Sequence, residues 1–591
     1  MPVGFDFGTT NSLISVVSGD RVVDVLDSEG RPHPSVVRYE GERVVVGREA
    51  RNELEAVGLG VHGNTVRSPK VFLGDDVVEV GGVEMNPVDV VADVLKHVKA
   101  ESLKSRQAER LDGVQSAVVT IPVTMDGRRR RALREAYALA GISVAQFVHE
   151  PLAALYGYLR GAVDSEDLRR RFARRNVLVV DWGGGTLDLT LCRVEAARIL
   201  QLRNGGTDQV GGDRFDEVIQ SEVVRRFSLA NGIGPTDQPS LDSRLRLRQD
   251  AENNKIELSQ RGSISFYRPA YFPESGATLE YELARSELEE VVRPLISAGM
   301  SEIDSLLSSV GFAAAQVSHV VVVGGMAAMP AIRSHLYEMF GPERVHVPDN
   351  SATLVSQGAA WIAHDAQRLV LAKPIELELA RGDYLPLLKA GDAMPTNREI
   401  TRNRVHLYCA DPSDGIAKFA FVSPTELREH PQASSRRTTL GVVTVRVDKK
   451  APPLTERLEL EVKIDDDLVL EVTATSAQEG DSDSADYYDL EFGLGLGENG
   501  LAYSVVEGES AGERATASAT GLAMRVNLAQ NAADQDAVPG DVLYLHRPSA
   551  FSPPPMPGPL ATNAQKQEHL YYRPCSVCKR QWGDPECRCA A

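Results

Sequence analysis

The amino-acid sequence predicts an α/β domain followed by an all-β sandwich and a tail rich in Pro, Gly and Cys. Up to about residue 367, short β-rich runs alternate with helical patterns. From about residue 373, apolar and polar residues alternate strictly, and after about residue 495 this periodicity is lost. Since 591 residues exceed what one hydrophobic core serves, we expect several domains.

Two strands and a helix illustrate the first domain. "NVLVV" (176–180) and "HVVVVGG" (319–325) predict buried strands, and Cys192 stands alone inside another apparent strand. Small and apolar residues recur at helical spacing over 128–140, which predicts a helix with one buried face. The residues of that face are Ala132, Leu133, Ala136, Leu139 and Ala140.

The overall charge excludes some partners. With 64 Lys and Arg against 83 Asp and Glu, the formal net charge is −19, which opposes binding to a nucleic-acid backbone. Two Arg runs, 128–131 and 169–175, are interpreted as solvated helix faces, with a local acidic partner as the alternative. No secretory signal pattern opens the sequence, and no apolar run is long enough to cross a bilayer. We expect a cytoplasmic protein that binds neither nucleic acid nor membrane.

Two similar glycine-rich stretches predict phosphate-binding hairpins. "GFDFGTTNS" (4–12) and "DWGGGTLDLT" (181–190) each place an acid, then Gly, then Thr, before a segment of period two. In a P-loop the turn opens a helix, so these turns are interpreted as hairpins of a duplicated lobe. Their N–H and hydroxyl groups suit phosphate oxygens, and Asp6 and Asp181 suit a hydrated Mg²⁺. Either stretch alone is more typical of a structural turn, and it is the pair that favours phosphate binding.

A third glycine site follows the strand of "VVVVGGMAAMPAIR" (320–333). There Gly324 and Gly325 precede an expected helix and allow close approach by a ligand.

These motifs, in this order with "HEPLAALYGY" (149–158) and "AENNKIELS" (251–259), resemble the nucleotide-binding domain of the DnaK-type seventy-kilodalton heat-shock chaperones. That family belongs to the actin-like (ribonuclease H-like) ATPases, and the resemblance covers most of residues 3–367. It implies slow, Mg²⁺-dependent hydrolysis of ATP to ADP and phosphate. It also implies unfolded polypeptides, J-domain cochaperones and nucleotide-exchange factors as partners, in protein folding and the stress response.

The resemblance assigns roles to individual residues. Lys70 would stabilise charge at the γ-phosphate, and Glu150 would orient the attacking water. A surface lysine and a plain helix cap are the alternatives for these two. The catalytic set it implies is Lys70, Glu150, Asp181 and Thr186. The nucleotide-binding set it implies is Asp6, Gly8, Thr9, Thr10, Asn11, Gly183, Gly184, Gly185, Gly211, Gly212, Glu252, Lys255, Ser259, Gly324, Gly325 and Asp349.

Two segments depart from the family pattern. Met326, Ala327 and Ala328 stand where the family has an arginine-bearing segment that stacks on adenine. "PDNSATLVSQGAA" (348–360) is longer than its usual counterpart. These departures bear on nucleotide affinity and base selectivity.

The domain prediction places the ATPase domain at 1–367, an interdomain linker at 368–372 and a peptide-binding-like β-sandwich at 373–495. A β-hairpin is expected over 458–474, with further strands at 418–422, 441–447 and 488–494. Cys409 stands alone in another apparent strand. A non-peptide adaptor sandwich is the alternative. No helical lid is expected, so polypeptide binding should be weak and fast.

The tail divides into a low-complexity linker, 496–567, and a Cys-rich end, 568–591. A short element is expected near 540–548. The spacing of Cys575, Cys578, Cys587 and Cys589 suits one tetrahedral Zn²⁺, with free or redox-active thiols as the rival interpretation.

The leading hypothesis is an ATP-dependent, chaperone-like protein whose nucleotide state controls polypeptide binding. The main alternative is an ATP-binding scaffold or sensor without general folding activity. An actin-like filament or a sugar kinase is disfavoured by the appended sandwich. A pseudo-ATPase is disfavoured because Asp6, Lys70, Glu150, Asp181 and Thr186 are all present.

Overall fold

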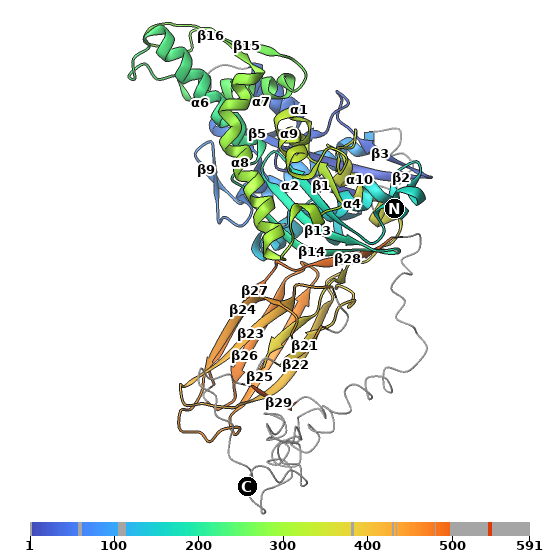
Figure 1. Ribbon diagram of the computed structural model, residues 1–591. Coiled ribbons are helices and arrows are strands. Elements are labelled where there is room, and N and C mark those ends of the chain that lie inside the picture. Colours follow the sequence, from blue (N-terminus) through green and yellow to red (C-terminus); the bar gives the residue numbers. More distant parts are fainter. Residues whose placement is uncertain are drawn as a thin grey trace, which may run out of the picture. The chain divides into compact units, whose positions relative to one another are not determined.

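The computed structural model describes residues 3–496, apart from 57–61, 105–113, 380–382, 428–430, 433 and 479, together with residues 542–545. The chain packs as two compact units (Figure 1). One unit contains the residues up to Leu369 and takes in the later segment that begins at Gly493. The other contains Val370–Phe492 and the short strand β29 (Val542–Leu545).

The first unit contains a mixed sheet near its N-terminus, with the strand order β11-β10-β1-β2-β3. β1 runs parallel to β10 and antiparallel to β2, so β1 and β2 form a hairpin. The strands are β1 (Val3–Phe7), β2 (Asn11–Ser18), β3 (Arg21–Val25), β10 (Ser116–Ile121) and β11 (Ser143–His149), and β4 (His33–Pro34) pairs with β2.

A second sheet in the same unit repeats this plan, with the order β18-β17-β12-β13-β14. β12 runs parallel to β17 and antiparallel to β13, as β1 does with β10 and β2. The strands are β12 (Arg175–Trp182), β13 (Leu187–Val194), β14 (Arg198–Thr207), β17 (His319–Val323) and β18 (Val345–His346). The mixed α/β class and both predicted hairpins are therefore present, in two sheets of the same topology.

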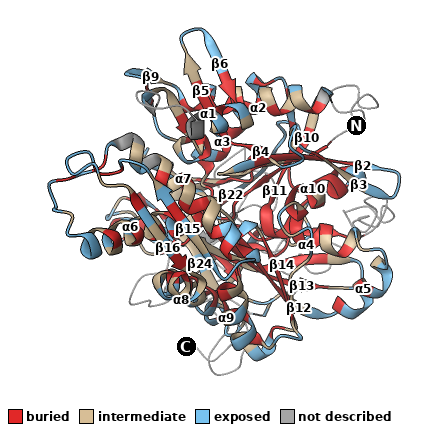
Figure 2. Cartoon of the chain, turned by 90° about the horizontal axis from the view of Figure 1, so that it is seen from above, coloured by how far each residue is buried: buried red, intermediate tan, exposed pale blue. Residues whose placement is uncertain are grey.

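Two buried helices, α4 (Glu150–Arg160) and α10 (Leu354–His364), pack against each other between these sheets. α10 covers β1 and β2, whereas α4 covers β12 and β13. A Cβ atom added to Gly157 would lie 2.8 Å from the Cα of Gly358, so the helices can cross this closely only at glycine. Figure 2 shows these helices and the central strands as the buried part of the unit.

The remaining elements of the first unit surround this core. α8 packs on β13 and β14, and α6 packs on α7 and α8. The helices are α1 (Arg48–Ala56), α2 (Pro87–Lys104), α3 (Gly127–Leu139), α5 (Ser165–Phe172), α6 (Gly212–Asn231), α7 (Leu241–Leu258), α8 (Arg285–Ser309) and α9 (Pro330–Phe340). The smaller strands are β5 (Val36–Glu40), β6 (Arg43–Val46), β7 (Thr65–Arg67), β8 (Val78–Val80), β9 (Val83–Met85), β15 (Ser263–Arg268) and β16 (Leu279–Ala284).

One of the two Arg runs differs from its prediction. α3 confirms the helix expected over 128–140, but Arg130 within it is fully buried rather than solvated. Its Nε donates a hydrogen bond to the carbonyl oxygen of Met125 at 2.8 Å. The run spans more than one face of the helix, so at least one arginine had to turn inward. In the second run, Arg170 and Arg171 are exposed and pair with acids one turn earlier, as expected.

The second unit is all-β, as predicted. Its strands form two sheets with the orders β21-β20-β23-β24 and β27-β26-β25-β22-β29. β25 and β26 confirm the hairpin expected over 458–474, and alternate residues of β25 are buried. The strands of these sheets are β20 (Ile375–Glu378), β21 (Tyr384–Leu388), β22 (Ile400–Cys409), β23 (Ile416–Pro424), β24 (Arg437–Arg446), β25 (Arg457–Asp465), β26 (Leu470–Ser476) and β27 (Ser482–Tyr487). The two-residue strand β19 (Val370–Leu371) belongs to neither of them.

The strand expected over 488–494 is shorter and lies elsewhere. β28 (Phe492–Gly495) pairs antiparallel with β14, so it extends the second sheet of the first unit. Leu494 faces Ile199 in this pairing, and both side chains are fully buried. Within residues 3–496 the chain therefore passes from one unit to the other near Leu369 and back near Phe492, whereas the predicted sandwich ran on to residue 495.

Some predictions fall on the tail. The element expected over 540–548 corresponds to β29, which pairs parallel with β22. The four tail cysteines lie outside the described residues, so the zinc site stays a prediction. In the part of the chain that the structure describes, no helix is both long and apolar enough to span a membrane.

Candidate functional site

The two glycine-rich hairpins meet at their tips. The first turn, between β1 and β2, carries Thr9 and Thr10, and the second, between β12 and β13, carries Gly184 and Gly185. A Cβ atom on Gly184 would clash with Oγ1 of Thr10, and one on Gly185 would lie 2.6 Å from Oγ1 of Thr9. Only glycine fits here, so the sequence of the second turn is dictated by the first. Gly8, Asn11 and Gly183 complete the two turns.

Two carboxylates lie directly behind these tips, the buried Asp181 and the half-buried Asp6. Oδ1 of Asp6 accepts a hydrogen bond from Thr120 at 2.8 Å. Burial raises the pKa of Asp6 to about 6, and the charge of Glu150 acts in the same direction. Burial likewise raises the pKa of Asp181 well above its ordinary value, with Glu150 and a third carboxylate, Asp188, adding to the effect. Such a cluster of like charges is costly unless a cation binds beside it.

The third carboxylate, Asp188, was missed by the sequence analysis. It lies opposite Asp181 in the β12–β13 hairpin and is fully buried. Its Oδ1 accepts the N–H of Val123 at 2.8 Å, and Oδ2 has no hydrogen-bond partner among the described residues. Burial raises the pKa of Asp188 to about 7, with Glu150 as the next cause. An acid inside the apolar alternation of "TLDLTL" was the available signal.

Lys70 and Glu150 form a buried ion pair. Nζ of Lys70 lies 3.0 Å from Oε1 of Glu150, and the two side chains are 5% and 11% exposed. Lys70 belongs to the short 3-10 helix η2 (Pro69–Phe72), and Glu150 begins α4. The sequence separates them by 80 residues, so the fold alone brings them together. Lys70 is therefore buried rather than on the surface, and Glu150 lies in the first turn of α4, whose N-cap is His149. The roles of both residues in hydrolysis stay predictions.

The other predicted glycines support the second hairpin. Gly324 has φ of +83°, and a Cβ atom there would lie 2.6 Å from Oδ1 of Asp181. Gly212 at the start of α6 donates its N–H to the carbonyl oxygen of Gly183 at 3.1 Å, and a Cβ atom on Gly211 would clash with Gly185. Gly325 begins the 3-10 helix η5 (Gly325–Ala328). Close backbone approach explains glycine at Gly211 and Gly324.

The residues expected on the adenosine side lie on and around α7. Lys255 donates to the carbonyl oxygen of Gly212 at 3.0 Å and pairs with Asp216 at 2.7 Å. Ser259 is the C-terminal cap of α7. The thioether of Met326 lies close to Gly212, where an added Cβ atom would be 3.1 Å from the sulfur. Asp349 is exposed, next to the turn whose Ser351 carbonyl accepts the N–H of Gly324.

Glu252 on α7 is held by arginines from the N-terminal half of the unit. Its Oε1 lies 3.0 Å from Arg51 in α1, and its Oε2 lies 3.2 Å from Arg67 in β7. Although burial would raise the pKa of Glu252, the two arginines hold it below its ordinary value. These ion pairs join the two halves of the unit across the candidate site.

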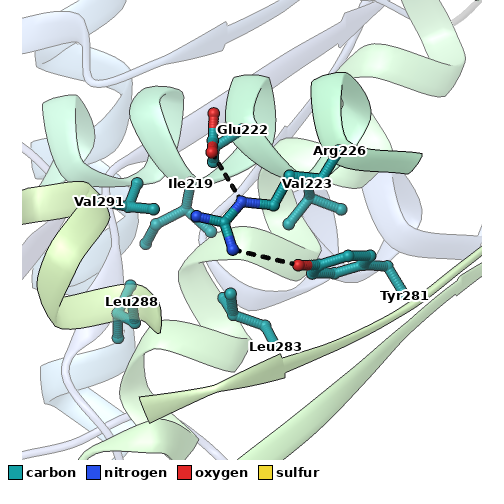
Figure 3. A pocket seen from close by; sticks show the side chains of 8 residues that line it. All are labelled: Ile219, Glu222, Val223, Arg226, Tyr281, Leu283, Leu288 and Val291. Carbon is teal, nitrogen blue, oxygen red and sulfur yellow. Dashed lines mark hydrogen bonds and ion pairs between the residues drawn. The ribbon is translucent and has the colours of Figure 1, made fainter. Parts of the chain in front are cut away.

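A separate hollow lies among α6, α8 and β16 (Figure 3). Arg226 projects into it and contacts Glu222 at 2.7 Å and the hydroxyl of Tyr281 at 3.5 Å. None of the predicted site residues lines it. The hollow is therefore distinct from the site formed by the hairpins.

The residues at the hairpins suit a hydrated cation better than a directly ligated one. Among the described residues, no three His, Cys, Asp or Glu side chains are grouped closely enough to hold a metal ion directly. Oδ2 of Asp188 and the hydroxyl of Thr10 are buried polar atoms without a hydrogen-bond partner in the part of the chain that the structure describes. A carboxylate oxygen suits the water of a hydrated ion, and a hydroxyl can donate to a phosphate oxygen. The geometry thus fits a nucleotide phosphate chain with Mg²⁺.

Comparison with known proteins agrees with this geometry. The family described as Hsp70 protein matches residues 2–79 and 73–487 of the chain. The Chaperone protein DnaK of Halobacterium salinarum (strain ATCC 29341 / DSM 671 / R1) is 28% identical over 509 residues, which cover 84% of this chain and 75% of the relative. The protein of the same name from strain ATCC 700922 / JCM 11081 / NRC-1 matches with the same figures. With the two hairpins, the buried carboxylates and a match over most of its length, this chain belongs to the Hsp70 family.

Proposed function

We propose that the protein is an ATP-dependent chaperone, in which hydrolysis of ATP to ADP and phosphate in the first unit controls polypeptide binding by the β-sandwich. Membership of the Hsp70 family supports ATPase and chaperone activity in general. The observation that carries the proposal is the buried Lys70–Glu150 pair beside the buried Asp181 and Asp188 and the half-buried Asp6, behind two glycine and threonine hairpins. Phosphoryl transfer needs positioned groups and electrostatic stabilisation, and this arrangement can supply both.

In this proposal the hairpins hold the phosphates. Thr9, Thr10, Asn11 and the backbone of residues 183–185 supply hydroxyl and N–H donors, which suit phosphate oxygens. Glu252, Lys255 and Ser259 would contact the nucleoside. The glycines 211, 212, 324 and 325 leave room for the ligand next to the backbone.

Magnesium would be held through water by Asp6 and Asp181, with Asp188 beside them. When bound, the ion neutralises phosphate charge. Its positive charge would also return the three carboxylates to their ionised forms, because each pKa is raised while the cluster is uncompensated. Binding of the cation and ionisation of the carboxylates would therefore stabilise each other.

Lys70 and Glu150 would have different roles in hydrolysis. The ammonium of Lys70 would stabilise the negative charge that develops on the γ-phosphate. The carboxylate of Glu150 would orient the attacking water and hold its proton. Thr186, whose side chain acts to lower the pKa of Asp188, would position the phosphate end of the second hairpin. We expect slow turnover because hydrolysis serves as a switch.

The test is Mg²⁺-dependent ATP hydrolysis by the purified protein beside Lys70→Ala and Thr186→Ala, with and without an unfolded polypeptide. We expect slow activity that polypeptide raises and that falls by about 100-fold or more in Lys70→Ala, since removal of one preorganised electrostatic group costs that much. If polypeptide does not change the rate of hydrolysis, the chaperone hypothesis is rejected in favour of an ATP-binding scaffold or sensor. ATP neither bound nor hydrolysed would refute the proposal.

The partners follow from the same proposal. A J-domain cochaperone and a nucleotide-exchange factor would act on the first unit, and an unfolded polypeptide would bind the sandwich, in a cytoplasmic setting. Stimulation of hydrolysis by a J-domain protein is the direct measurement. If a helical lid is missing, bound peptide should dissociate in seconds in the ADP state, and dissociation over many minutes would contradict that expectation.

A further inference from the structure

A buried contact joins the two sheets of the first unit immediately before Glu150. His149 is the last residue of β11 in the first sheet, and Gln201 belongs to β14 in the second. Nδ1 of His149 lies 3.3 Å from the side-chain amide of Gln201, and both residues are fully buried. The imidazole makes no capping hydrogen bond to α4, although His149 occupies the N-cap position. Its contact with the second sheet therefore needs another explanation.

A β-bulge turns Gln201 toward this contact. In the pairing of β13 with β14, Leu191 faces Arg203 and Cys192 faces Gln201, so Leu202 is an extra residue in β14. Gln201 and Arg203 consequently lie on opposite faces of the sheet. Gly205 shares the face of Arg203 and lies against Leu306 of α8. Without the bulge, Gln201 would point toward α8 instead of toward α4 and His149.

The strand that carries Gln201 is held on both edges. β13 pairs with one edge, and β28 pairs with residues 198–200 on the other. The N–H of Leu496 adds a hydrogen bond to the carbonyl oxygen of Ala197 at 2.7 Å. A strand fixed on both sides is a rigid support for a buried side chain.

The imidazole is neutral in this environment. Burial lowers the pKa of His149 to about 3, and the positive charge of the buried Arg130 lowers it as well. A neutral ring beside a glutamine amide forms a hydrogen bond without adding charge near the Lys70–Glu150 pair. The pair thus behaves as a structural link rather than as an acid or base.

We infer that Gln201 and His149 are positioning residues for Glu150. Gln201 fixes the imidazole, the imidazole fixes the first residue of α4, and the Glu150 carboxylate is thereby held 3.0 Å from Nζ of Lys70. The contact also sets the first sheet against the second, which carries Asp181 and Asp188. This inference rests on the proposed ATPase function. Displacement of a reacting group by about 1 Å can cost on the order of 100-fold in rate.

The experiment compares Gln201→Leu with a matched control, Thr190→Val. Thr190 lies on β13 and donates a buried hydrogen bond to Asn204 of β14 at 3.0 Å, so Thr190→Val removes a comparable bond from the same sheet. ATP affinity and single-turnover hydrolysis are measured separately, with the melting temperature. We expect Gln201→Leu to slow hydrolysis about 10- to 100-fold with ATP affinity within about twofold. Thr190→Val should lower the melting temperature similarly and hydrolyse ATP at the wild-type rate.

A double-mutant cycle tests whether the two residues act as one unit. His149→Phe should slow hydrolysis to a similar degree, and the His149→Phe/Gln201→Leu protein should be no slower than either single variant. If Gln201→Leu fails to fold, Gln201→Asn keeps a buried amide but withdraws it from the imidazole by one methylene, and the same loss of rate is expected.

The outcomes separate the two proposals. Hydrolysis at the wild-type rate in Gln201→Leu or Gln201→Asn, or an equal loss in Thr190→Val, would overturn the positioning role while leaving the ATPase intact. Additive losses in the double variant would also overturn it. A wild-type protein that binds ATP without hydrolysing it would overturn the proposed function itself, and the positioning role with it.

Discussion

Both units contain closed buried ion pairs, such as Lys70–Glu150 in the first, but the first unit also contains a cluster of like charges. In the first unit, Asp6, Asp181 and Asp188 lie together, and burial raises the pKa of each. In the sandwich, two buried cations are closed in pairs with buried carboxylates: Arg437 lies 2.7 Å from Glu376, and Lys373 lies 3.1 Å from Glu491. All four of these side chains are at most 5% exposed. A closed pair serves the fold, whereas a cluster of like charges is maintained for a ligand that neutralises it.

The largest expected effect on stability breaks a closed pair. Arg437→Met leaves Glu376 buried without its cation, and it also removes a guanidinium stacked 3.5 Å from the ring centre of Tyr384. We expect the sandwich to lose about 3–5 kcal/mol of unfolding free energy. Urea unfolding followed by a sandwich-specific probe measures it. The double variant Arg437→Met/Glu376→Leu should recover much of the loss, and a double variant as unstable as the single one would contradict this account.

In the first unit, removing a buried charge is expected to raise the free energy of unfolding rather than lower it. Asp188→Asn keeps the acceptor for the Val123 N–H and removes a charge whose Oδ2 has no partner among the described residues. Without nucleotide and metal at pH 8, the variant should be more stable than wild type by about 1–3 kcal/mol. Exposed Asp76→Asn is the control and should change little. In Mg²⁺ and ATP, the advantage of Asp188→Asn should vanish, and destabilisation in the free protein would refute the comparison.

The pH dependence of that advantage sharpens the comparison. The folded pKa of Asp188 is about 7, above its ordinary value of 3.8, so the folded protein binds a proton here that the unfolded chain releases. Wild-type stability from this group is present at low pH and is lost as the pH rises through about 7. The difference in unfolding free energy between Asp188→Asn and wild type should therefore shrink from pH 8 to pH 5. If the difference is constant over this range, the stabilisation by Asp188→Asn comes from packing and not from removal of the charge.

The smallest expected effect concerns the ion pairs across the candidate site. Arg51→Ala removes one of the two arginines on Glu252, while Arg67 remains. We expect release of a fluorescent ADP, followed by stopped flow, to become about 3- to 10-fold faster, since a partly buried ion pair contributes on the order of 1 kcal/mol. Arg43→Ala breaks an exposed pair with Glu49 and is the control. Equal release rates in wild type and Arg51→Ala would show that these pairs do not hold the halves together.

Local pattern was enough for much of the fold. Both hairpins, the helix over 128–140 and the hairpin over 458–474 are present because period and turn residues encode them locally. Arg130 and β28 were missed for a shared reason. Whether an arginine is buried, or which edge a short strand joins, depends on partners far away in the chain. Sequence periodicity carries no information about such partners.

In the candidate site, too, some features are encoded locally in the sequence and others depend on distant contacts. The sequence by itself determined the glycine and threonine turns, since their backbone geometry restricts the residue type at each position. Only the tertiary structure decided that Lys70 reaches Glu150, that Asp188 joins Asp6 and Asp181, and that Gln201 reaches His149. These contacts depend on the packing of two sheets through α4 and α10 and on one extra residue in β14. A one-residue change of register reverses the face of a strand, and that outcome is settled by packing rather than by local propensity.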